Sequence, residues 1–576
     1  MKKRYFRREQ KYGIELPKTV KRALEIDTET GTTFWRDAIR KEMNTVGKAF
    51  KILESDEPIP VGHTLLSVHI VFDVKNTFQR KARLVADGHL SPDVSKSITY
   101  ASVVSRESVR LVFMLAALNG LKVETADIQG AYLNAPCAEK YYIICGAEFG
   151  PQFEGHRAVI IRALYGLKSA GASWRKMCAD VLIKELGFTQ CKADNDVYLK
   201  PATKEDGSEY YEYVLVYTDD LLVISMDPRR ILLFMDQHFL LKPDSIGKPT
   251  KYLGADIGTH IFPGDDGTEY WYMGSEQYVK EAVRNVETWL DLRGRSLKSK
   301  AASVLPLNYT PELDCTPLLT KDDIASYYPQ LIGITRWMVE LGRIDICTEV
   351  SVMSSYAAAP RVGHLEAMFH MFAYLKSHNR SKMVFDSTYV PMQEQPKPDW
   401  TKFYGDVKEE LPPDMPQPRG KPVQMTTYED SDHAGDKLNR RSRTGVLMYC
   451  NRSPIAWKSV KQLSVETSSF GSEFTALRTA VELSLGLRYK LRMMGVPIDG
   501  PIYIKGDNMS VITNSSVPES MLKKKSNSIA FHFCREESAK GTVVISYEPS
   551  QTNLADMLTK IQGGMERQKL VQRVLF

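Results

Sequence analysis

Apolar residues in the central part of the chain form short continuous runs that are interrupted by an acidic turn. Two apolar runs, residues 214–216 and 221–224, flank the acidic turn Tyr217-Thr218-Asp219-Asp220. Strand-forming runs joined through an Asp-containing turn predict a hairpin with carboxylates at its tip. A bare Asp-Asp pair between strands is more often an ordinary polar turn, so this pattern by itself predicts a hairpin and no chemistry.

Helical spacing marks three further stretches. Residues 34–43 predict one helix, and Glu473 opens another, in which apolar residues recur at positions 474, 477, 481 and 485. A longer stretch, 327–376, is predicted to be mostly helical with a break near Pro360. Core packing is the simpler interpretation of its apolar stripe, which comprises Tyr328, Leu331, Ile334, Trp337 and Met338. Between residues 65 and 256 strands and helices alternate, which indicates an α/β chain.

Length and composition describe a globular protein of several domains. The chain has 576 residues, of which 43% are hydrophobic and 25% charged, enough to bury sizeable cores. No apolar run approaches a membrane span, and the basic start, residues 1–9, has no apolar segment of a secretory signal. Prolines recur among charges in residues 390–423, which predicts an extended, semi-rigid linker that lets the following domain trail the preceding one.

Cysteine spacing and charge narrow the chemistry further. The eight cysteines show no Cys-x-x-Cys or Cys/His ligand spacing, so we expect reduced thiols in an intracellular protein and no zinc site. The net charge of +6 is modest, and nucleic-acid binding requires positive charge arranged along a groove. A solvated face is the simpler interpretation of each basic group taken singly, and the candidate groups are Arg488, Lys490 and Arg492; Arg440, Arg441 and Arg443; and Lys523, Lys524 and Lys525.

A third carboxylate, Asp127, ends a predicted strand and is followed five residues later by Tyr132. Here the sequence resembles the reverse transcriptases, whose motif A is an Asp, four residues and an aromatic, and whose motif C is Tyr-x-Asp-Asp. The resemblance implies that Asp127 and Asp219 hold two Mg²⁺ ions, or Mn²⁺, with Asp220 as a weaker ligand. It also implies that Tyr132 excludes ribose 2′-hydroxyls. Two divalent ions activate the attacking oxygen and stabilise the leaving oxygen of such a displacement.

Residues 162–174, Arg-Ala-Leu-Tyr-Gly-Leu-Lys-Ser-Ala-Gly-Ala-Ser-Trp, resemble motif B of the copia-type LTR retrotransposons. Ser169 and Gly171 stand where that family usually has Gln and Pro, which affects the expected template contacts more than the metal chemistry. Residues 80–86 resemble the fingers segment that meets the incoming triphosphate, although a solvated strand edge is nearly as good an interpretation of such a basic run. The resemblance implies a dNTP-binding set of Lys81, Arg83, Ile128, Tyr132, Gly166 and Lys168.

The C-terminal third carries a second acidic set, which looks like a copia-type RNase H domain. Its members are expected on a strand, a helix, a strand end and a final helix, and the resemblance implies that they hold two Mg²⁺ ions astride the scissile phosphate. Asp432 and Asp436 compete for the first position with the residue that ends the strand. Gly471 replaces a usual Glu outside the ligand set, so we expect only a local effect there. The expected ligands are Asp430, Glu473, Asp507 and Asp556.

The ordered series of motifs predicts an α/β (α+β) multidomain chain with fingers, a ferredoxin-like palm and a thumb, followed by a ribonuclease H-like mixed sheet. The predicted division is a leader (1–60), fingers and palm (61–260), thumb and connection (261–389), linker (390–423), RNase H domain (424–565) and tail (566–576).

The predicted function is RNA-directed DNA synthesis with cleavage of the RNA of RNA–DNA hybrids. Expected partners are an RNA template, a DNA primer and product, the hybrid, dNTPs and polyprotein neighbours (integrase, protease, capsid), and a dimer stays open. The expected location is a cytoplasmic virus-like particle or the nucleus. The alternative hypothesis is a catalytically inactive or host-adopted nucleic-acid-binding relic, and an aromatic at position 132 disfavours an RNA-making polymerase.

Overall fold

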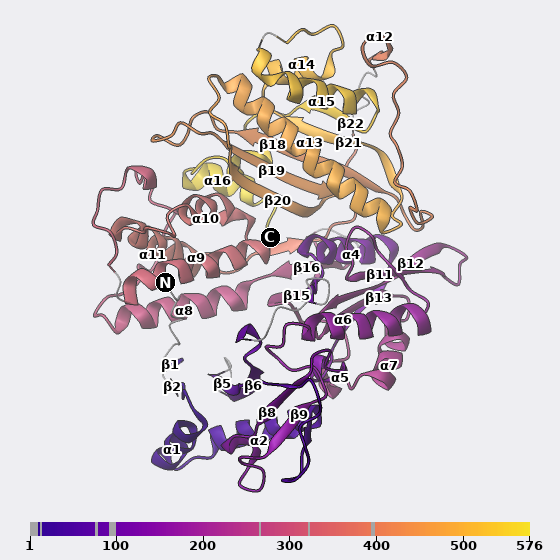
Figure 1. Cartoon of the computed structure of the whole chain (residues 1–576). Helices are drawn as coiled ribbons and strands as arrows, with labels where there is room; N and C mark the ends of the chain where they lie inside the picture. The colour runs from indigo at the N-terminus through magenta and orange to yellow at the C-terminus, as the bar shows by residue number, and fades with distance from the viewer. Residues whose placement is uncertain are drawn as a thin grey trace.

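The computed structural model describes residues 10–11, 14–74, 79–90, 99–263, 267–320, 323–392, 398–522 and 524–576. The basic start (1–9), Lys523 and Pro396 lie outside the described residues. Figure 1 shows the N-terminal strands at the bottom, a central sheet with α4 and α6 above them, a cluster of helices α8 to α11 beside that sheet, and the C-terminal third at the top. No helix in the described ranges combines the length and the apolar character of a membrane span.

The N-terminal part contains small sheets covered by helices. The strands β5 and β6 form an antiparallel pair, and a second sheet has the order β3-β9-β8-β4. The helix predicted at 34–43 is confirmed as α2, which packs on β6 through the buried Trp35 and Ile39. The bounds are α1 Val20–Thr30, α2 Phe34–Val46, β3 Phe50–Ile52, β4 Thr64–Leu65, β5 Val68–Val74, β6 Arg80–Ala86, β8 Tyr141–Ile144 and β9 Arg157–Ile160.

The central sheet has the order β10-β11-β12-β13-β7 and carries the predicted acidic hairpin. That hairpin is confirmed, since β12 and β13 pair antiparallel from Tyr213 opposite Ile224 to Tyr217 opposite Asp220. The helix α4 begins with an N-cap at Ser105 and is buried along nearly its whole length. The bounds are α4 Arg106–Asn119, β7 Lys122–Asp127, α5 Ala131–Asn134, α6 Ala170–Asp180, β10 Thr189–Gln190, β11 Val197–Thr203, β12 Glu209–Tyr217, β13 Asp220–Ser225 and α7 Pro228–His238.

A sheet of the order β14-β15-β16-β17 and a helical cluster follow. The predicted break near Pro360 is confirmed, but the helical stretch is interrupted a second time at 341–346. Tyr328, Leu331 and Met338 lie in the core of the cluster, as predicted for the apolar stripe. The bounds are β14 Lys251–Tyr252, β15 Ala255–His260, β16 Tyr270–Gly274, α8 Glu276–Asp291, α9 Asp323–Glu340, α10 Cys347–Ser354, α11 Val362–Ser377 and β17 Lys382–Val384.

The C-terminal third is a mixed five-stranded sheet of the order β20-β19-β18-β21-β22. The strands β18, β19 and β20 are antiparallel neighbours, whereas β21 and β22 run parallel to β18. The long helix α13 packs on this sheet, mainly on β18 and β19, so the predicted mixed sheet with a long helix is confirmed. The bounds are β18 Val423–Ser431, β19 Arg443–Cys450, β20 Ser453–Lys461, α13 Ser469–Met493, β21 Ile498–Gly506, α14 Met509–Ser516, α15 Ser528–Ala539, β22 Val543–Tyr547 and α16 Gly564–Val571.

The proline-rich segment is packed along both large sheets, and its interpretation as a free tether is wrong for the described residues 398–422. Glu409 bridges Arg488 and Arg492 of α13 with N···O distances of 2.8 and 2.7 Å. On the other side, the hydroxyl of Tyr211 in β12 donates to the carbonyl of Gln417 at 2.8 Å. The segment, which includes the short α12 (Thr401–Tyr404), therefore connects the nuclease-like sheet to the central sheet by contacts on both sides. We call residues 398–422 the strap.

Candidate functional site: two acidic centres

The first acidic centre lies where the end of β12, the start of β13 and the end of β7 meet. Because β13 pairs antiparallel with β7, Asp220 lies directly opposite Asp127. The backbone N–H of Ile128 donates to the carbonyl of Asp219 at 2.7 Å, which ties the hairpin tip to the end of β7. Thr218 has φ +58°, a left-handed conformation that is costly for a β-branched residue. Its carbonyl accepts a hydrogen bond from Trp174 Nε1 at 2.6 Å, which helps hold the strained tip.

Burial and mutual repulsion favour protonation of these carboxyls. Burial raises the pKa of Asp219 above its usual range, and it raises the pKa of Asp220 to about 6, with the negative charges of Asp219 and Asp127 adding to the shift. Lys242 is ion-paired with one carboxylate oxygen of Asp127. The other oxygen, Oδ1, is buried and has no hydrogen-bond partner within the part of the chain that the structure describes. A divalent cation would supply what this set lacks, since it would neutralise the clustered charge and give Asp127 Oδ1 a partner.

Two of the predicted dNTP-binding side chains lie beside this centre. The guanidinium of Arg83 lies over the ring of Tyr165 at 4.1 Å, and the rings of Tyr165 and Tyr132 are 5.1 Å apart. Burial raises the pKa of Asp219, and the positive charge of Arg83 offsets part of this rise. Burial also raises the pKa of Tyr132, and the negative charge of Asp219 adds to that rise. Arg83 and Tyr132 are therefore placed next to the acidic tip.

The other predicted dNTP contacts have different surroundings. Lys81 lies on the same strand as Arg83, two residues away, opposite Asp73. The side chain of Ile128 is fully buried in the core, so at this position only the backbone faces the hairpin. Lys168 is partly buried in the turn before α6.

Gly166 is required by the close approach of two backbones. It has φ +92°, and a Cβ there would lie 2.1 Å from the carbonyl oxygen of Ala86. The neighbouring Tyr165 carbonyl accepts a hydrogen bond from the Ala86 N–H at 2.7 Å, which joins motif B to the end of β6. The glycine thus allows β6 to lie against the turn that precedes α6.

The two departures from motif B have local partners. Ser169 is fully buried, its hydroxyl donates to Glu139, and its N–H donates to Glu139 Oε1 at 3.1 Å. A Cβ on Gly171 would lie 3.0 Å from the Cβ of Ala101, tighter than an ordinary contact. Ser169 is therefore buried, and Gly171 is partly buried.

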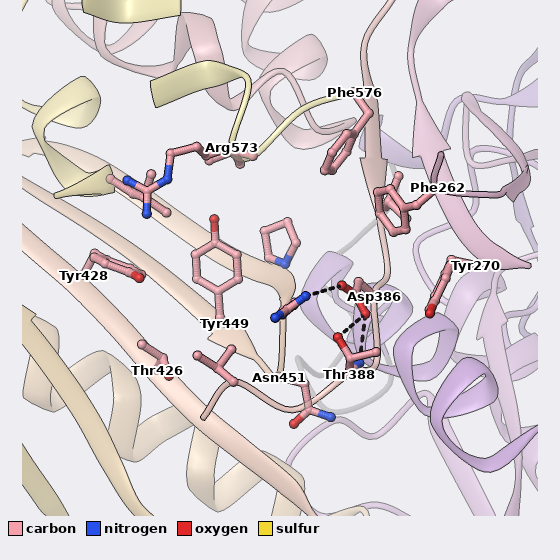
Figure 2. Close-up of a pocket in the computed structure, with 16 residues that line it drawn as sticks. Phe262, Tyr270, Asp386, Thr388, Thr426, Tyr428, Tyr449, Asn451, Arg573 and Phe576 are labelled. Carbon is pink, nitrogen blue, oxygen red and sulfur yellow. Dashed lines mark hydrogen bonds and ion pairs between the residues drawn. The ribbon is translucent and has the colours of Figure 1, made fainter. Parts of the chain in front are cut away.

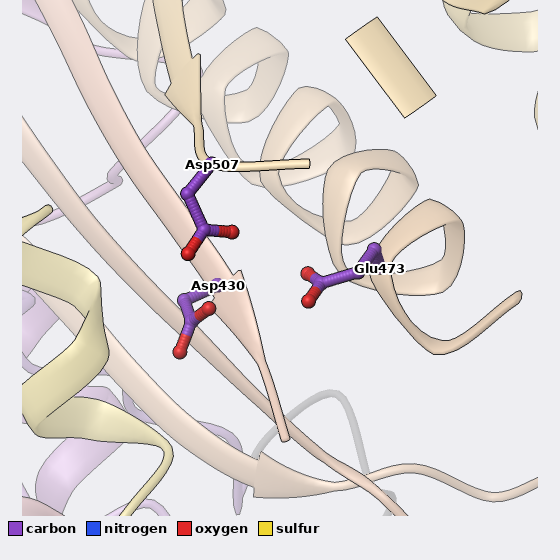
Figure 3. Close-up of side chains that lie close together, drawn as sticks. All are labelled: Asp430, Glu473 and Asp507. Atoms are coloured by element: carbon purple, nitrogen blue, oxygen red, sulfur yellow. The ribbon is translucent and has the colours of Figure 1, made fainter. Parts of the chain in front are cut away.

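The second acidic centre gathers three of the four predicted nuclease acids. Asp430 lies at the end of β18, Glu473 in the first turns of α13 and Asp507 directly after β21. They point toward one another (Figure 3), and each offers an oxygen within 4.8 Å of the others. Among the described residues this is the one group of three acids or metal-binding side chains that meets this spacing. Carboxylate oxygens so placed suit Mg²⁺ or Mn²⁺.

The electrostatics of this centre resemble those of the first. Burial raises the pKa of Asp430 to about 7, and burial together with the charges of Asp430 and Asp507 raises the pKa of Glu473 to about 9. Asp556 is not a member of the group of three. Its carboxylate instead pairs with Lys560 at 2.6 Å, and Lys560 also lies 3.7 Å from Asp430.

In this region the structure agrees with the choice of Asp430 over its competitors and adds residues that the sequence patterns missed. Asp432 and Asp436, the competitors for the first position, are engaged elsewhere, by the Arg443 N–H and by Lys461. Lys560, which follows Asp556 by four residues, and Thr559, whose hydroxyl donates to Asp430, were missed. The i,i+4 spacing of Asp556 and Lys560 was the available signal.

The predicted phosphate-binding group Arg488, Lys490 and Arg492 does not form a basic face, and its alternative as a solvated face is also wrong. Arg488 and Arg492 pair with Glu409, and Lys490 pairs with Glu107 at 2.8 Å. The sequence does not distinguish a basic residue whose acidic partner comes from a distant segment from a basic residue that faces solvent. Arg443 of the second group is buried as well, and donates to Ser351 at 2.7 Å.

The matched family defines the class of the N-terminal half. Residues 55–264 match the family model for the reverse transcriptase (RNA-dependent DNA polymerase). Similarity continues beyond that domain. The chain is 24% identical over 541 residues to the Retrovirus-related Pol polyprotein from transposon RE1 of Arabidopsis thaliana, which covers 91% of this chain and 32% of that protein. It is 24% identical over 537 residues to the Retrovirus-related Pol polyprotein from transposon TNT 1-94 of Nicotiana tabacum, covering 91% of this chain and 36% of that protein.

A yeast relative and two solved structures complete the comparison. Identity to the Transposon Ty1-LR2 Gag-Pol polyprotein of Saccharomyces cerevisiae is 22% over 539 residues, which covers 91% of this chain and 28% of that protein. A foamy viral protease-reverse transcriptase in complex with ds DNA aligns with TM-score 0.44 at 12% identity, covering 89% of this chain and 69% of that one. LC11-RNase H1 aligns with TM-score 0.20 at 18% identity, covering 24% of this chain and 92% of that one.

Residues 55–264 therefore carry the similarity to the reverse transcriptase family. Over 91% of its length the chain is similar to Pol polyproteins of transposons, in agreement with the resemblance that the order of the motifs indicated. It spans about a third of the length of the curated relatives that it matches.

Proposed function

We propose that this chain copies an RNA template into DNA at the first acidic centre and cleaves the RNA of the resulting hybrid at the second. The observation that carries the proposal is the presence, in one chain, of a reverse transcriptase domain with Asp219 at its hairpin tip and of a separate mixed sheet on which Asp430, Glu473 and Asp507 converge. Chemistry at phosphorus needs clustered carboxylates of this kind, because they hold divalent cations in place.

At the first centre Asp127, Asp219 and Asp220 would hold Mg²⁺ or Mn²⁺, and the bound metal would supply an activated 3′-oxygen and a stabilised leaving group. The chain's own residues bind and orient the nucleotide. The guanidinium of Arg83, fixed over Tyr165, offsets triphosphate charge beside the carboxylates. Tyr132 presents its ring to the sugar from the adjoining helix α5, where a 2′-hydroxyl meets it sterically. Lys81 adds positive charge from the same strand as Arg83.

At the second centre Asp430, Glu473 and Asp507 would hold the metal, with Asp556 joining from the opposite side of Asp430. Lys560 is shared between Asp430 and Asp556, so its ammonium group supplies positive charge to both carboxylates. Displacement of Lys560 by metal would free Asp556 for the fourth ligand position. We propose an RNA template, a DNA primer, the hybrid and dNTPs as partners, with integrase, protease and capsid as polyprotein neighbours and a dimer as the form to test.

We propose residues 61–260 as fingers and palm, because they carry the first acidic centre, and residues 424–565 as the nuclease, because they carry the second. Residues 261–389, which lie between them, are proposed as thumb and connection. The proposed location is a virus-like particle in the cytoplasm or the nucleus. Retention of all seven acids favours an active enzyme over a binding relic.

The test measures Mg²⁺-dependent dNTP incorporation on a primed RNA template and, separately, cleavage of a labelled RNA–DNA hybrid. Asp219→Asn is expected to lower synthesis by about a hundredfold or more and leave cleavage intact, and Asp507→Asn is expected to do the reverse. Asp291→Asn, at an exposed position of α8, is the matched control for both. Loss of both activities in either single variant, or no activity of the unmodified chain with Mg²⁺ or Mn²⁺, would contradict the proposal.

A further inference from the structure

A cavity of about 480 Å³ lies between the nuclease-like sheet, the strands β15 to β17 and the last residues of the chain. None of the seven acids of the two centres lines it. Its volume falls in the range of small-molecule sites, which are mostly apolar with a few placed polar groups.

Two hydroxyls in this cavity are buried without a partner among the described residues. Tyr449 Oη and Thr426 Oγ1 make no hydrogen bond, although the two residues are 7% and 5% exposed. Thr426 and Tyr449 are direct neighbours in the β18–β19 pairing, so both side chains stand on the same face of the sheet. Buried hydroxyls are nearly always paired, and two adjacent unpaired ones indicate a ligand or water that satisfies them.

Aromatic rings form two facing walls. Figure 2 shows Tyr428 and Tyr449 on one side of the cavity and Phe262, Tyr270 and Phe576 on the other. On the second wall Phe262 lies 5.3 Å from Tyr270 and 5.0 Å from Phe576, centroid to centroid. The rings of Tyr270 and Phe576 are tilted by 54° and 70° to that of Phe262, so a flat aromatic group stacks on one of these rings and meets the edges of the others.

Two arginines supply positive charge at the rim. Arg573, which lines the cavity together with Tyr449 (Figure 2), is exposed and donates to the carbonyl of Thr552 at 2.8 Å. That bond uses one of its nitrogens and leaves other N–H groups of the guanidinium for an anion. Arg452 lies 3.9 Å from Asp386, at the other end of the cavity.

We propose that this cavity binds a mononucleotide, with the base against the wall of Phe262, Tyr270 and Phe576, its polar edge toward the hydroxyls of Tyr449 and Thr426, and its phosphate at Arg573. A purely apolar ligand would leave the two hydroxyls unpaired, whereas a base edge offers both donors and acceptors to them. The aromatic walls and the guanidinium fit a flat anion. The site is separate from both acidic centres, so it does not depend on the proposed catalytic function.

The experiment measures binding of adenosine 5′-monophosphate to the whole chain by equilibrium dialysis in EDTA, which removes metal from both acidic centres. One bound nucleotide per chain is expected. Tyr449→Phe is expected to weaken binding ~5- to 10-fold, since it deletes one hydrogen bond to the base. Arg573→Gln is expected to weaken adenosine 5′-monophosphate but leave adenosine unchanged.

Controls separate this cavity from other sites. Tyr547→Phe, at an exposed tyrosine in β22 that does not line the cavity, should leave binding unchanged. Asp219→Asn should also leave it unchanged, because a nucleotide held at the polymerase centre would respond to that change. Equal binding of 4-hydroxyphenylacetate, a flat anion without a base edge, would overturn the nucleotide assignment. Absence of binding at millimolar concentration, or equal binding by Tyr449→Phe and the unmodified chain, would overturn the site.

Discussion

At the scale of single residues, the carboxyl of Asp430 links metal binding to stability. Burial raises its pKa to about 7, so the folded state holds the proton more strongly than the unfolded state does. The stability gained from that proton is fully present below the ordinary pKa near 4 and is lost as the pH rises through about 7. The metal-free protein therefore carries a destabilising charge at neutral and higher pH.

We predict that Asp430→Asn stabilises the metal-free chain at pH 8 by roughly 4 kcal/mol relative to its effect at pH 4, taking about 1.4 kcal/mol per pKa unit. The measurement is thermal or urea denaturation in EDTA at both pH values. Asp291→Asn is the control, because that carboxyl lies on an exposed surface. An equal effect of Asp430→Asn at the two pH values would show that the proton is not linked to folding.

Gly166 offers a second prediction at this scale. Gly166→Ala places a Cβ 2.1 Å from the carbonyl oxygen of Ala86, whereas Gly155 has a similar positive φ with nothing within 4 Å. Gly155→Ala should therefore cost about 1 kcal/mol from backbone strain, and Gly166→Ala about 1–3 kcal/mol more from the clash. Denaturant melts of the two variants measure the difference. Equal costs would mean that the contact between motif B and β6 relaxes freely.

At the scale of elements, the strap formed by residues 398–422 carries a two-sided contact. Glu409 accepts from Arg488 and Arg492, both largely buried on α13, while Arg419 pairs with Glu209 on β12. Loss of the shared carboxylate leaves two guanidinium groups without their ion pair. Such a loss is expensive when the cations are buried.

We predict that Glu409→Ala lowers the free energy of unfolding by about 2 kcal/mol and speeds protease cleavage within the strap. Glu410→Ala, at the exposed neighbouring residue, is the matched control and should do neither. Limited proteolysis and urea denaturation provide the two readings. If both variants behave alike, the strap is held by its other contacts.

At the scale of the whole molecule, one core runs from the central sheet into the nuclease-like sheet. It joins residues of α4, such as Phe113, to residues of β18 and β19, such as Met425 and Val446. Arg110 is buried at this junction, where it donates to the carbonyls of Ile455 at 3.0 Å and Glu340 at 2.7 Å, and lies 3.9 Å over the ring of Trp457. Burial lowers the pKa of Arg110 to about 10, a sign of how fully it is desolvated.

We predict that the central and nuclease-like sheets of the unmodified chain unfold together, and that Arg110→Met separates them into two transitions, because two backbone carbonyls lose their donor and the ring its cation. Calorimetry, with hydrogen exchange on both sheets, detects the separation. Arg284→Met, at an exposed arginine of α8, should leave a single transition. A single transition in Arg110→Met as well would place the coupling in the apolar core.

Local patterns determined much of the fold. The hairpin at Asp219 and Asp220, the helix at residues 34–43 and the helix that opens near Glu473 follow from residue spacing alone, because hydrophobic periods of two and of about 3.6 residues specify strands and helices. The resemblance also implied that Asp430 and Asp507 lie at strand ends, where the structure finds them.

Tertiary structure decided what each charge does. The basic group Arg488, Lys490 and Arg492 became internal ion pairs because the strap and α4 supply their acidic partners from 79 or more residues away, beyond the reach of any local pattern. Lys560 meets Asp430 for the same reason, whereas its pairing with Asp556 is local. The sequence determined by itself which side chains are acidic and which segments pair, since both depend on neighbours along the chain. Only the packing of distant segments decided which charges meet, which are buried and where two aromatic walls enclose a cavity.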